Sequence, residues 1–121
     1  MTTKIHNVKK MAAQGDVLFR KVKKIADGFA AVERKGPIIV AHSETGHHHV
    51  IEIPGVTMHC RADSPLIAYL KMGDDVRAFE VVHQRPWDTH DTLRCVGKPG
   101  DVWEVRRQRE HTPEGWRRVQ D

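Results

Sequence analysis

Short apolar runs separated by turn-forming residues make up most of the chain. The runs are rich in Val, Ile, Leu and aromatic residues and are bounded by Gly, Pro, Asp and Ser, a pattern typical of β-strands joined by tight turns. Eight strands are predicted, at Asp16–Val22, Pro37–His42, His48–Ile53, Val56–Arg61, Leu66–Met72, Val76–His83, Thr92–Val96 and Val102–Arg109. We therefore expect a single all-β domain over residues 15–121, folded as a small antiparallel barrel or sandwich with its strands in meander order.

The turns and the two ends of the chain complete this picture. Pro54-Gly55 and Gly73-Asp74-Asp75 are predicted to reverse the chain between neighbouring strands. Residues 1–14 have no clear period and carry three lysines, which predicts an N-terminal arm that is mobile or held by a partner. Short helices are predicted at Asn7–Ala13 and at Pro113–Val119, the second beginning with a proline that suits a first helical turn.

Composition fits this expectation and narrows the class of protein. A chain of 121 residues with 39% hydrophobic and 30% charged residues supports one globular core and excludes a disordered or coiled-coil protein. No apolar run is long enough to span a membrane, and the first residues lack the apolar centre of a secretion signal. The sequence therefore predicts a cytoplasmic protein without a membrane partner.

Charge and cysteine content exclude several functions. The net charge of +4 comes from interleaved acids and bases, and the arginines near the end are mixed with glutamates, which favours salt bridges over nucleic-acid binding. Cys60 and Cys95 are far apart and lie in no zinc-binding spacing, so buried or half-buried thiols are expected, with a single disulfide as the alternative in an oxidising compartment. The chain has no GxSxG, P-loop or GxGxxG motif, so nucleophilic and nucleotide-cofactor chemistry are not favoured.

Histidine is the unusual residue, with nine in the chain. His47 and His49 are two apart at the start of a predicted strand, so their side chains share a face with Cα atoms about 6.5 Å apart. That spacing allows two imidazoles to bind one ion. Glu44, or alternatively Glu52, would supply a carboxylate ligand or fix the tautomer of a ligating imidazole.

A second histidine pair follows in another strand and the loop after it. His83 ends the predicted strand at Val76–His83, and His90 comes after a proline-containing loop. Imidazole nitrogens suit zinc, iron, copper and nickel, of which zinc or iron is expected here. Three protein ligands with one open position would make a catalytic site, and four would make a structural one. The predicted metal ligands are His47, His49, His83, His90 and Glu44.

The remaining histidines are weaker candidates. His59 and Cys60 are neighbours within one strand and project from opposite faces, so at most one of them can join the same site. His6 in the arm and His111 near the tail are expected at the surface.

The HxH pattern on a strand resembles the first motif of the cupins, a family that binds iron, manganese, zinc or nickel inside a β-barrel. Glu52 follows the histidines too early for the cupin pattern, and the strand after Pro99-Gly100 carries Trp103 where a cupin has its third histidine. The resemblance therefore implies a cupin-like barrel rather than a cupin active site.

A closer resemblance covers most of residues 14–121. The chain is similar to a small uncharacterised family found in bacteria and their phages. The shared motifs are QGDVL at 14–18, ETGHHH at 44–49, the later histidine pair, a Pro-Gly before an aromatic strand, RQRE at 107–110 and RRVQD at 117–121. The chain departs from that family by placing His111 where a tyrosine stands and by an apparent insertion at 85–89. The resemblance implies relatedness and no established activity.

Two functions remain open at this point. The first is a metal-binding β protein, with enzymatic activity undecided and no substrate assigned. The alternative is a non-enzymatic assembly protein, such as a structural or decoration component of a phage particle, which would place it in the virion. Its strand edges and N-terminal arm would then contact other subunits, so a homo-oligomer or an assembly partner is expected.

Overall fold

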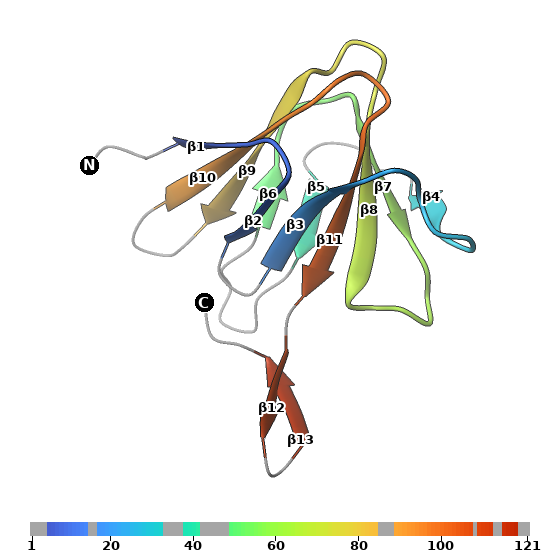
Figure 1. The fold of residues 1–121 in the computed structure, drawn as a ribbon, viewed down its shortest axis with the longest axis vertical. Coiled ribbons are helices and arrows are strands. Elements are labelled where there is room, and N and C mark those ends of the chain that lie inside the picture. Colours follow the sequence, from blue (N-terminus) through green and yellow to red (C-terminus); the bar gives the residue numbers. More distant parts are fainter. Residues whose placement is uncertain are drawn as a thin grey trace.

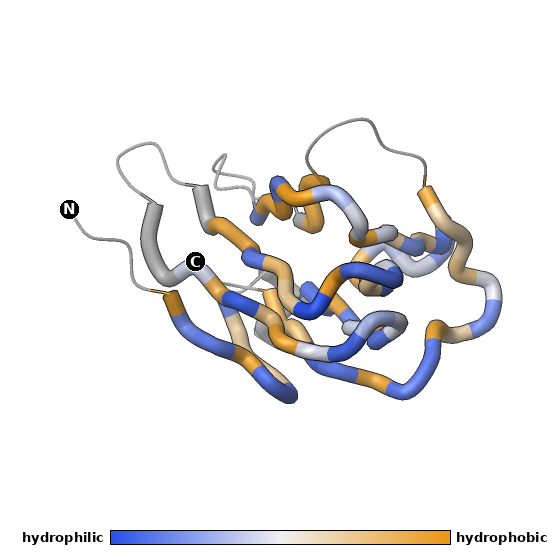
Figure 2. The backbone as a smooth tube through the Cα atoms, turned by 90° about the horizontal axis from the view of Figure 1, so that it is seen from above, coloured by the Kyte–Doolittle hydropathy of each residue, from blue (hydrophilic) through white to orange (hydrophobic). Residues whose placement is uncertain are grey.

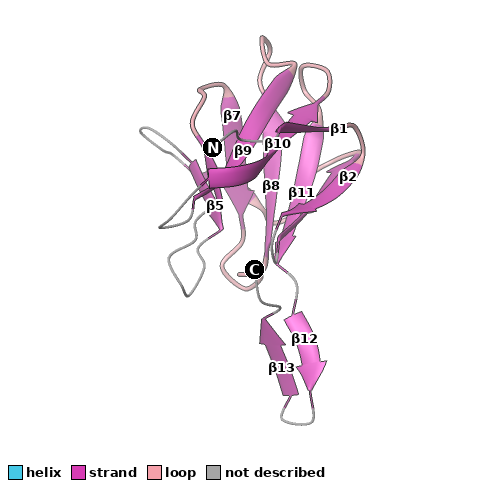
Figure 3. Cartoon of the chain, turned by 90° about the vertical axis from the view of Figure 1, so that its left-hand side faces the viewer, coloured by secondary structure: helices cyan, strands magenta, loops and turns pink. Residues whose placement is uncertain are grey.

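The fold is built from strands and turns. The computed structural model describes residues 5–14, 17–32, 38–41, 49–84, 89–107, 109–112 and 115–118, and these contain no helix (Figures 1 and 3). The strands are β1 (Ile5–Val8), β2 (Met11–Gln14), β3 (Val17–Val22), β4 (Ala30–Val32), β5 (Ile38–Ala41), β6 (His49–Ile51), β7 (Val56–Cys60), β8 (Ile67–Met72), β9 (Ala78–Gln84), β10 (Thr89–Val96), β11 (Val102–Arg107), β12 (Arg109–Thr112) and β13 (Gly115–Arg118). The prediction of an all-β chain is confirmed.

The strands form two larger sheets and one separate hairpin. Sheet A has the order β1-β10-β9-β6-β5, and sheet B has the order β2-β3-β11-β8-β7-β4. All pairs are antiparallel except β1 with β10, which is parallel. The hairpin of β12 and β13 extends from one end of the molecule (Figure 1). No pairing among the described strands joins the two sheets edge to edge, so the architecture is a sandwich and barrel closure is not found.

The order of the strands corrects the predicted meander. The hairpins β5-β6, β7-β8 and β9-β10 lie in sheets A, B and A, and β11 returns to sheet B. The segments containing Pro54-Gly55 and Gly73-Asp74-Asp75 are therefore crossings between sheets and not hairpin turns. These two crossings touch, because the Gly73 amide donates to the Gly55 carbonyl at 2.7 Å. Turn-forming residues predict that the chain changes direction, but they do not predict whether the strand after the turn pairs with the strand before it.

The core lies between the sheets and is closed by aromatic side chains from both. Phe79 of β9 and Trp103 of β11 meet edge to face, with ring centroids 5.9 Å apart. Trp103 and Val105 are two residues apart in β11, and both face the core. Buried and more exposed residues alternate at the start of β3 and of β7, and Figure 2 shows short hydrophobic and hydrophilic stretches following one another along the chain. This alternation is what an antiparallel sandwich requires.

Both predicted helices are wrong. The segment expected as Asn7–Ala13 contributes β1 to sheet A and β2 to sheet B. The tail expected as Pro113–Val119 contains β13, in which Gly115 pairs with Thr112 of β12 and Arg117 pairs with Glu110 of β12. A helix of seven residues is marginal without tertiary packing, and Gly115 disfavours the second predicted helix further. Strand pairing satisfies the hydrogen-bonding groups of the backbone instead.

Within the described ranges no helix has the length and apolar character that a membrane crossing needs.

Candidate metal centre

Three histidines from three neighbouring strands stand in one cross-strand row. His49 of β6 pairs with His83 of β9, and His83 pairs in turn with His90 of β10. Directly opposed residues in antiparallel strands have Cα atoms about 4.5 to 5.5 Å apart and share a face of the sheet. We call these three residues the histidine row. The register therefore brings together three of the five residues that the sequence predicted as ligands.

His49 lies on the face of sheet A that packs against sheet B, and the backbone register relates positions 83 and 90 to it. His49 is two residues from Ile51, and His83 is two residues from Val81, and both of these apolar residues are fully buried in the core. The His49 side chain is itself fully buried, with 0% exposure. Positions 49 and 83 therefore belong to the inner face, and the pairing of His90 with His83 places position 90 there too.

A β-bulge is needed to bring His90 into the row. The pairing of Leu93 with Val81 continued without interruption would set Asp91 opposite His83. The register shifts between His90 and Leu93, so that one extra residue of β10 places His90 there instead. A second shift occurs between Ile39 and Ala41 of β5, beside His49. Bulges on both sides of the row are consistent with a functional site, since they are over-represented next to such sites.

The tautomer of His49 is set by a glutamine from the opposite sheet. Gln14 at the end of β2 is 3% exposed, and its Nε2 donates to the carbonyl oxygen of Val81 at 2.9 Å. The Gln14 Oε1 is therefore the acceptor for His49 Nδ1, which lies 2.8 Å away. Because Nδ1 carries the proton, the neutral imidazole has its lone pair on Nε2. Histidine ligands of metals are commonly held in this way, with the other ring nitrogen donating to an oxygen.

The other predicted ligands are not part of the described row. His47 and Glu44 lie outside the described residues. Glu52, the alternative carboxylate, directly follows β6 and is exposed. No cluster of three His, Cys, Asp or Glu side chains suited to a metal occurs among the side chains that the structure describes, a set that contains only His49 of the row.

His59 and Cys60 are not brought to the row. Both lie in β7 of sheet B, where His59 pairs with Tyr69. Partial burial and the nearby Lys71 ammonium hold the pKa of His59 below its ordinary value of 6.5. His6 is exposed on β1, as expected, and His111 lies in β12.

The two cysteines lie in different sheets and form no disulfide. Cys60 in β7 is half-buried, and Cys95 in β10 is fully buried. Burial raises the pKa of the Cys95 thiol to about 12, with a small opposing effect from Lys21. Cys95 is therefore a core residue and not a nucleophile.

A buried carboxylate on the outer face of sheet B was not predicted. Glu104 is 5% exposed and accepts hydrogen bonds from Arg20 Nη2 at 3.3 Å and Arg106 Nε at 3.2 Å. The Tyr69 hydroxyl lies 3.5 Å from the same carboxylate. Burial, followed by the charge of Glu104, raises the pKa of Tyr69 above its ordinary value of 10. The expected salt bridges among the late charged residues are confirmed for Arg106 and Glu104.

Gln14 is the site residue that sequence reasoning missed. Its only signal in the sequence was its place at the start of the QGDVL run at 14–18, one of the motifs on which the expected family resemblance rested. Only the fold shows that this motif lies against the histidines, since β2 and β6 belong to different sheets.

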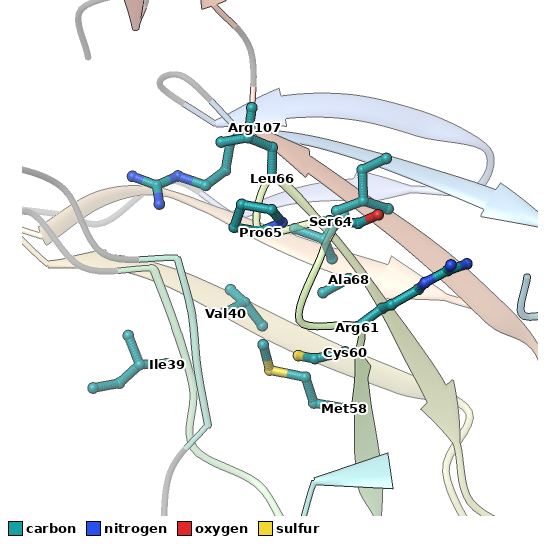
Figure 4. A pocket seen from close by; sticks show the side chains of 12 residues that line it. Ile39, Val40, Met58, Cys60, Arg61, Ser64, Pro65, Leu66, Ala68 and Arg107 are labelled. Carbon is teal, nitrogen blue, oxygen red and sulfur yellow. The ribbon is translucent and has the colours of Figure 1, made fainter. Parts of the chain in front are cut away.

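A pocket opens between the sheets beside β5 (Figure 4). Its volume is about 190 Å³, and its walls come from β5, β7, β8 and β11 together with the segment 61–66. The lining is mostly aliphatic, with Val40, Met58, Leu66 and Val105 among its members.

The fold and the row together define an all-β sandwich protein with a candidate metal centre between its sheets. The chain belongs to the family described as "Domain of unknown function (DUF8820)", whose model matches residues 13–108. This confirms the expectation of an uncharacterised family. Searches of curated proteins and of solved structures found no match.

Proposed function

We propose that this protein binds one transition-metal ion, zinc or iron, at the histidine row. The observation that carries the proposal is the hydrogen bond between His49 Nδ1 and Gln14 Oε1. It leaves the lone pair of His49 on Nε2, on the inner face that the register assigns to positions 83 and 90. A buried imidazole fixed in one tautomer beside two further histidines matches the chemistry of a metal ligand better than that of a packing residue.

His49, His83 and His90 would hold the ion, and His47 and Glu44 are further donors proposed from the segment that precedes β6. Three imidazoles suit zinc and iron. An ion held by three protein ligands keeps a position open for water or substrate and supplies Lewis acidity there. Gln14 would orient the His49 ring, and the core around Ile51 and Val81 would keep bulk water from the inner face.

Metal analysis of untagged protein tests the proposal. The wild type should retain about one zinc or iron per chain after reconstitution and dialysis, and the His83→Gln and His90→Gln variants should lose it. His6→Gln is the matched control, because it changes an exposed histidine on β1. Circular dichroism of each variant checks that the fold is kept. A wild type that retains neither metal would overturn the proposal.

An assembly role is the second candidate, and one observation favours it. The edge strands β1 and β2 carry exposed apolar side chains, Ile5 at 53% and Met11 at 60%. Apolar side chains on sheet edges are typical of sites where strands of other subunits add. Light scattering over a concentration series tests this role, which fails if the protein remains a monomer at every concentration.

A further inference from the structure

The pocket of Figure 4 is lined by β5, the strand that pairs with β6 and its His49. Val40, which lines the pocket, directly precedes Ala41, and Ala41 pairs with His49. The register shift in β5 falls at the same point, between Ile39 and Ala41. A ligand that enters the pocket would therefore lie beside the strand that carries His49.

Arg107 places a positive charge at the same level of the sandwich as Gln14, the hydrogen-bond partner of His49. Arg107 of β11 pairs with Val17 of β3, and Val17 pairs with Gln14 of β2. Trp103 and Val105 face the core, so alternation puts Arg107 on the same inner face. The cross-strand row that contains the hydrogen-bond partner of His49 thus also contains this arginine, which lines the pocket.

The second arginine of the pocket has a different orientation. In Figure 4 the Arg107 side chain extends over the side of the pocket formed by β5, whereas Arg61 extends to the opposite side. Arg61 forms an ion pair with Asp63 at 2.6 Å and donates to the carbonyl oxygen of Asp27 at 3.2 Å. Its guanidinium is therefore held away from the pocket.

From this geometry we infer that the pocket binds a small organic acid, with its apolar part among the aliphatic side chains and its anionic group on Arg107. Because this inference names the class of substrate for the proposed metal centre, it rests on the proposed function. A guanidinium has five N–H donors in a planar fork that matches a carboxylate. Val40, Met58 and Val105 supply the apolar contact.

The size of the pocket limits the ligand. An engineered protein cavity of about 150 Å³ is known to bind benzene. The pocket here, at about 190 Å³, fits a single ring or a short aliphatic chain with one acidic group. Benzoate is therefore a suitable probe, and benzyl alcohol is its uncharged counterpart of similar shape.

Binding of the two probes to metal-free protein, measured by calorimetry, tests the inference. Benzoate should bind at least about 10-fold more tightly than benzyl alcohol, because charge-assisted hydrogen bonds to a carboxylate are worth more than neutral ones. Arg107→Met should remove this preference. Arg61→Met is the matched control on the same rim and should retain it.

The outcomes separate this inference from the proposed function. Equal binding of the two probes, no binding of benzoate at millimolar concentration, or a preference that survives in Arg107→Met would each overturn the organic-acid site. An Arg107-dependent preference for benzoate in a protein that retains no zinc or iron would keep the acid site and remove the metal centre. A stoichiometric metal with no benzoate binding would give the reverse result.

Discussion

Nδ1 of the His49 imidazole lies 2.8 Å from Oε1 of Gln14, a residue 35 positions earlier in the chain and in the opposite sheet. The amide of Gln14 bridges a side chain of β6 and the backbone of β9, since its Nε2 donates to the Val81 carbonyl. Both bonds are buried, so neither His49 Nδ1 nor the Val81 carbonyl can turn to water if the amide is lost. One residue therefore couples the packing of the two sheets to the orientation of a proposed ligand.

Gln14→Leu is expected to reduce both stability and metal affinity. The change keeps the approximate size of the side chain but leaves two buried polar groups without this partner, which should lower the free energy of unfolding by about 1 to 3 kcal/mol. Metal affinity should fall about 10- to 100-fold, as is typical when the residue orienting a ligating histidine is removed. Urea unfolding and a zinc competition assay measure the two effects.

The exposed neighbour Met11 provides the control for this variant. Met11→Leu in the same strand should change the stability by less than about 0.5 kcal/mol and leave metal affinity unchanged. Metal affinity equal to that of the wild type in Gln14→Leu would show that the glutamine does not orient a ligand.

Local pattern predicted the strands because burial on one face imposes alternation, and all eight predicted segments overlap an observed strand. The partner sheet of each strand was not predictable in this way, because Pro54-Gly55 bends the chain equally well into a hairpin or into a crossing. The position of His90 shows a second limit of prediction from local sequence pattern. Counting back from the buried Cys95 and Leu93, alternation assigns Asp91 and not His90 to the inner face. Only the bulge reverses this assignment.

Cys95 is expected to resist thiol reagents in the folded protein. With a pKa of about 12, the thiol is ionised only to about 1 part in 10⁴ at pH 8, and it is fully buried as well. The half-buried Cys60 should react much faster. Mass spectrometry after brief iodoacetamide treatment measures the two rates. In guanidinium chloride both cysteines should react at similar rates, and fast labelling of Cys95 without denaturant would contradict the buried position.

Asp101 should contribute stability that is lost in acid. The Lys98 amide donates to its carboxylate at 2.9 Å, and Lys21 Nζ lies 3.4 Å away. The hydrogen bond from Lys98 is the main cause that lowers the pKa of Asp101 below its ordinary value of 3.8, with Lys21 adding to it. A lowered pKa in the folded state means that this stabilisation is fully present above about pH 4 and disappears as the pH falls through the folded-state pKa.

The urea midpoints of wild type and Asp101→Asn test this dependence. The variant should be less stable than the wild type at pH 7, and the gap should narrow by pH 2.5. Asp75→Asn, which removes an exposed carboxylate from a different turn, controls for the change in net charge. A gap of constant size across this range would show that ionised Asp101 does not stabilise the fold.

Alanine substitutions at Gly55 and Gly100 distinguish backbone strain from steric crowding in two segments that cross between the sheets. Both have positive φ, 93° and 89°, so alanine is strained at either position. A Cβ at Gly55 would lie 2.6 Å from Cγ2 of Val76, whereas a Cβ at Gly100 would meet nothing within 4 Å. Gly55→Ala should therefore destabilise the fold by about 1 kcal/mol more than Gly100→Ala. Adding Val76→Ala should cost less in Gly55→Ala than in wild type, and strictly additive effects in urea unfolding would show that the two side chains do not clash.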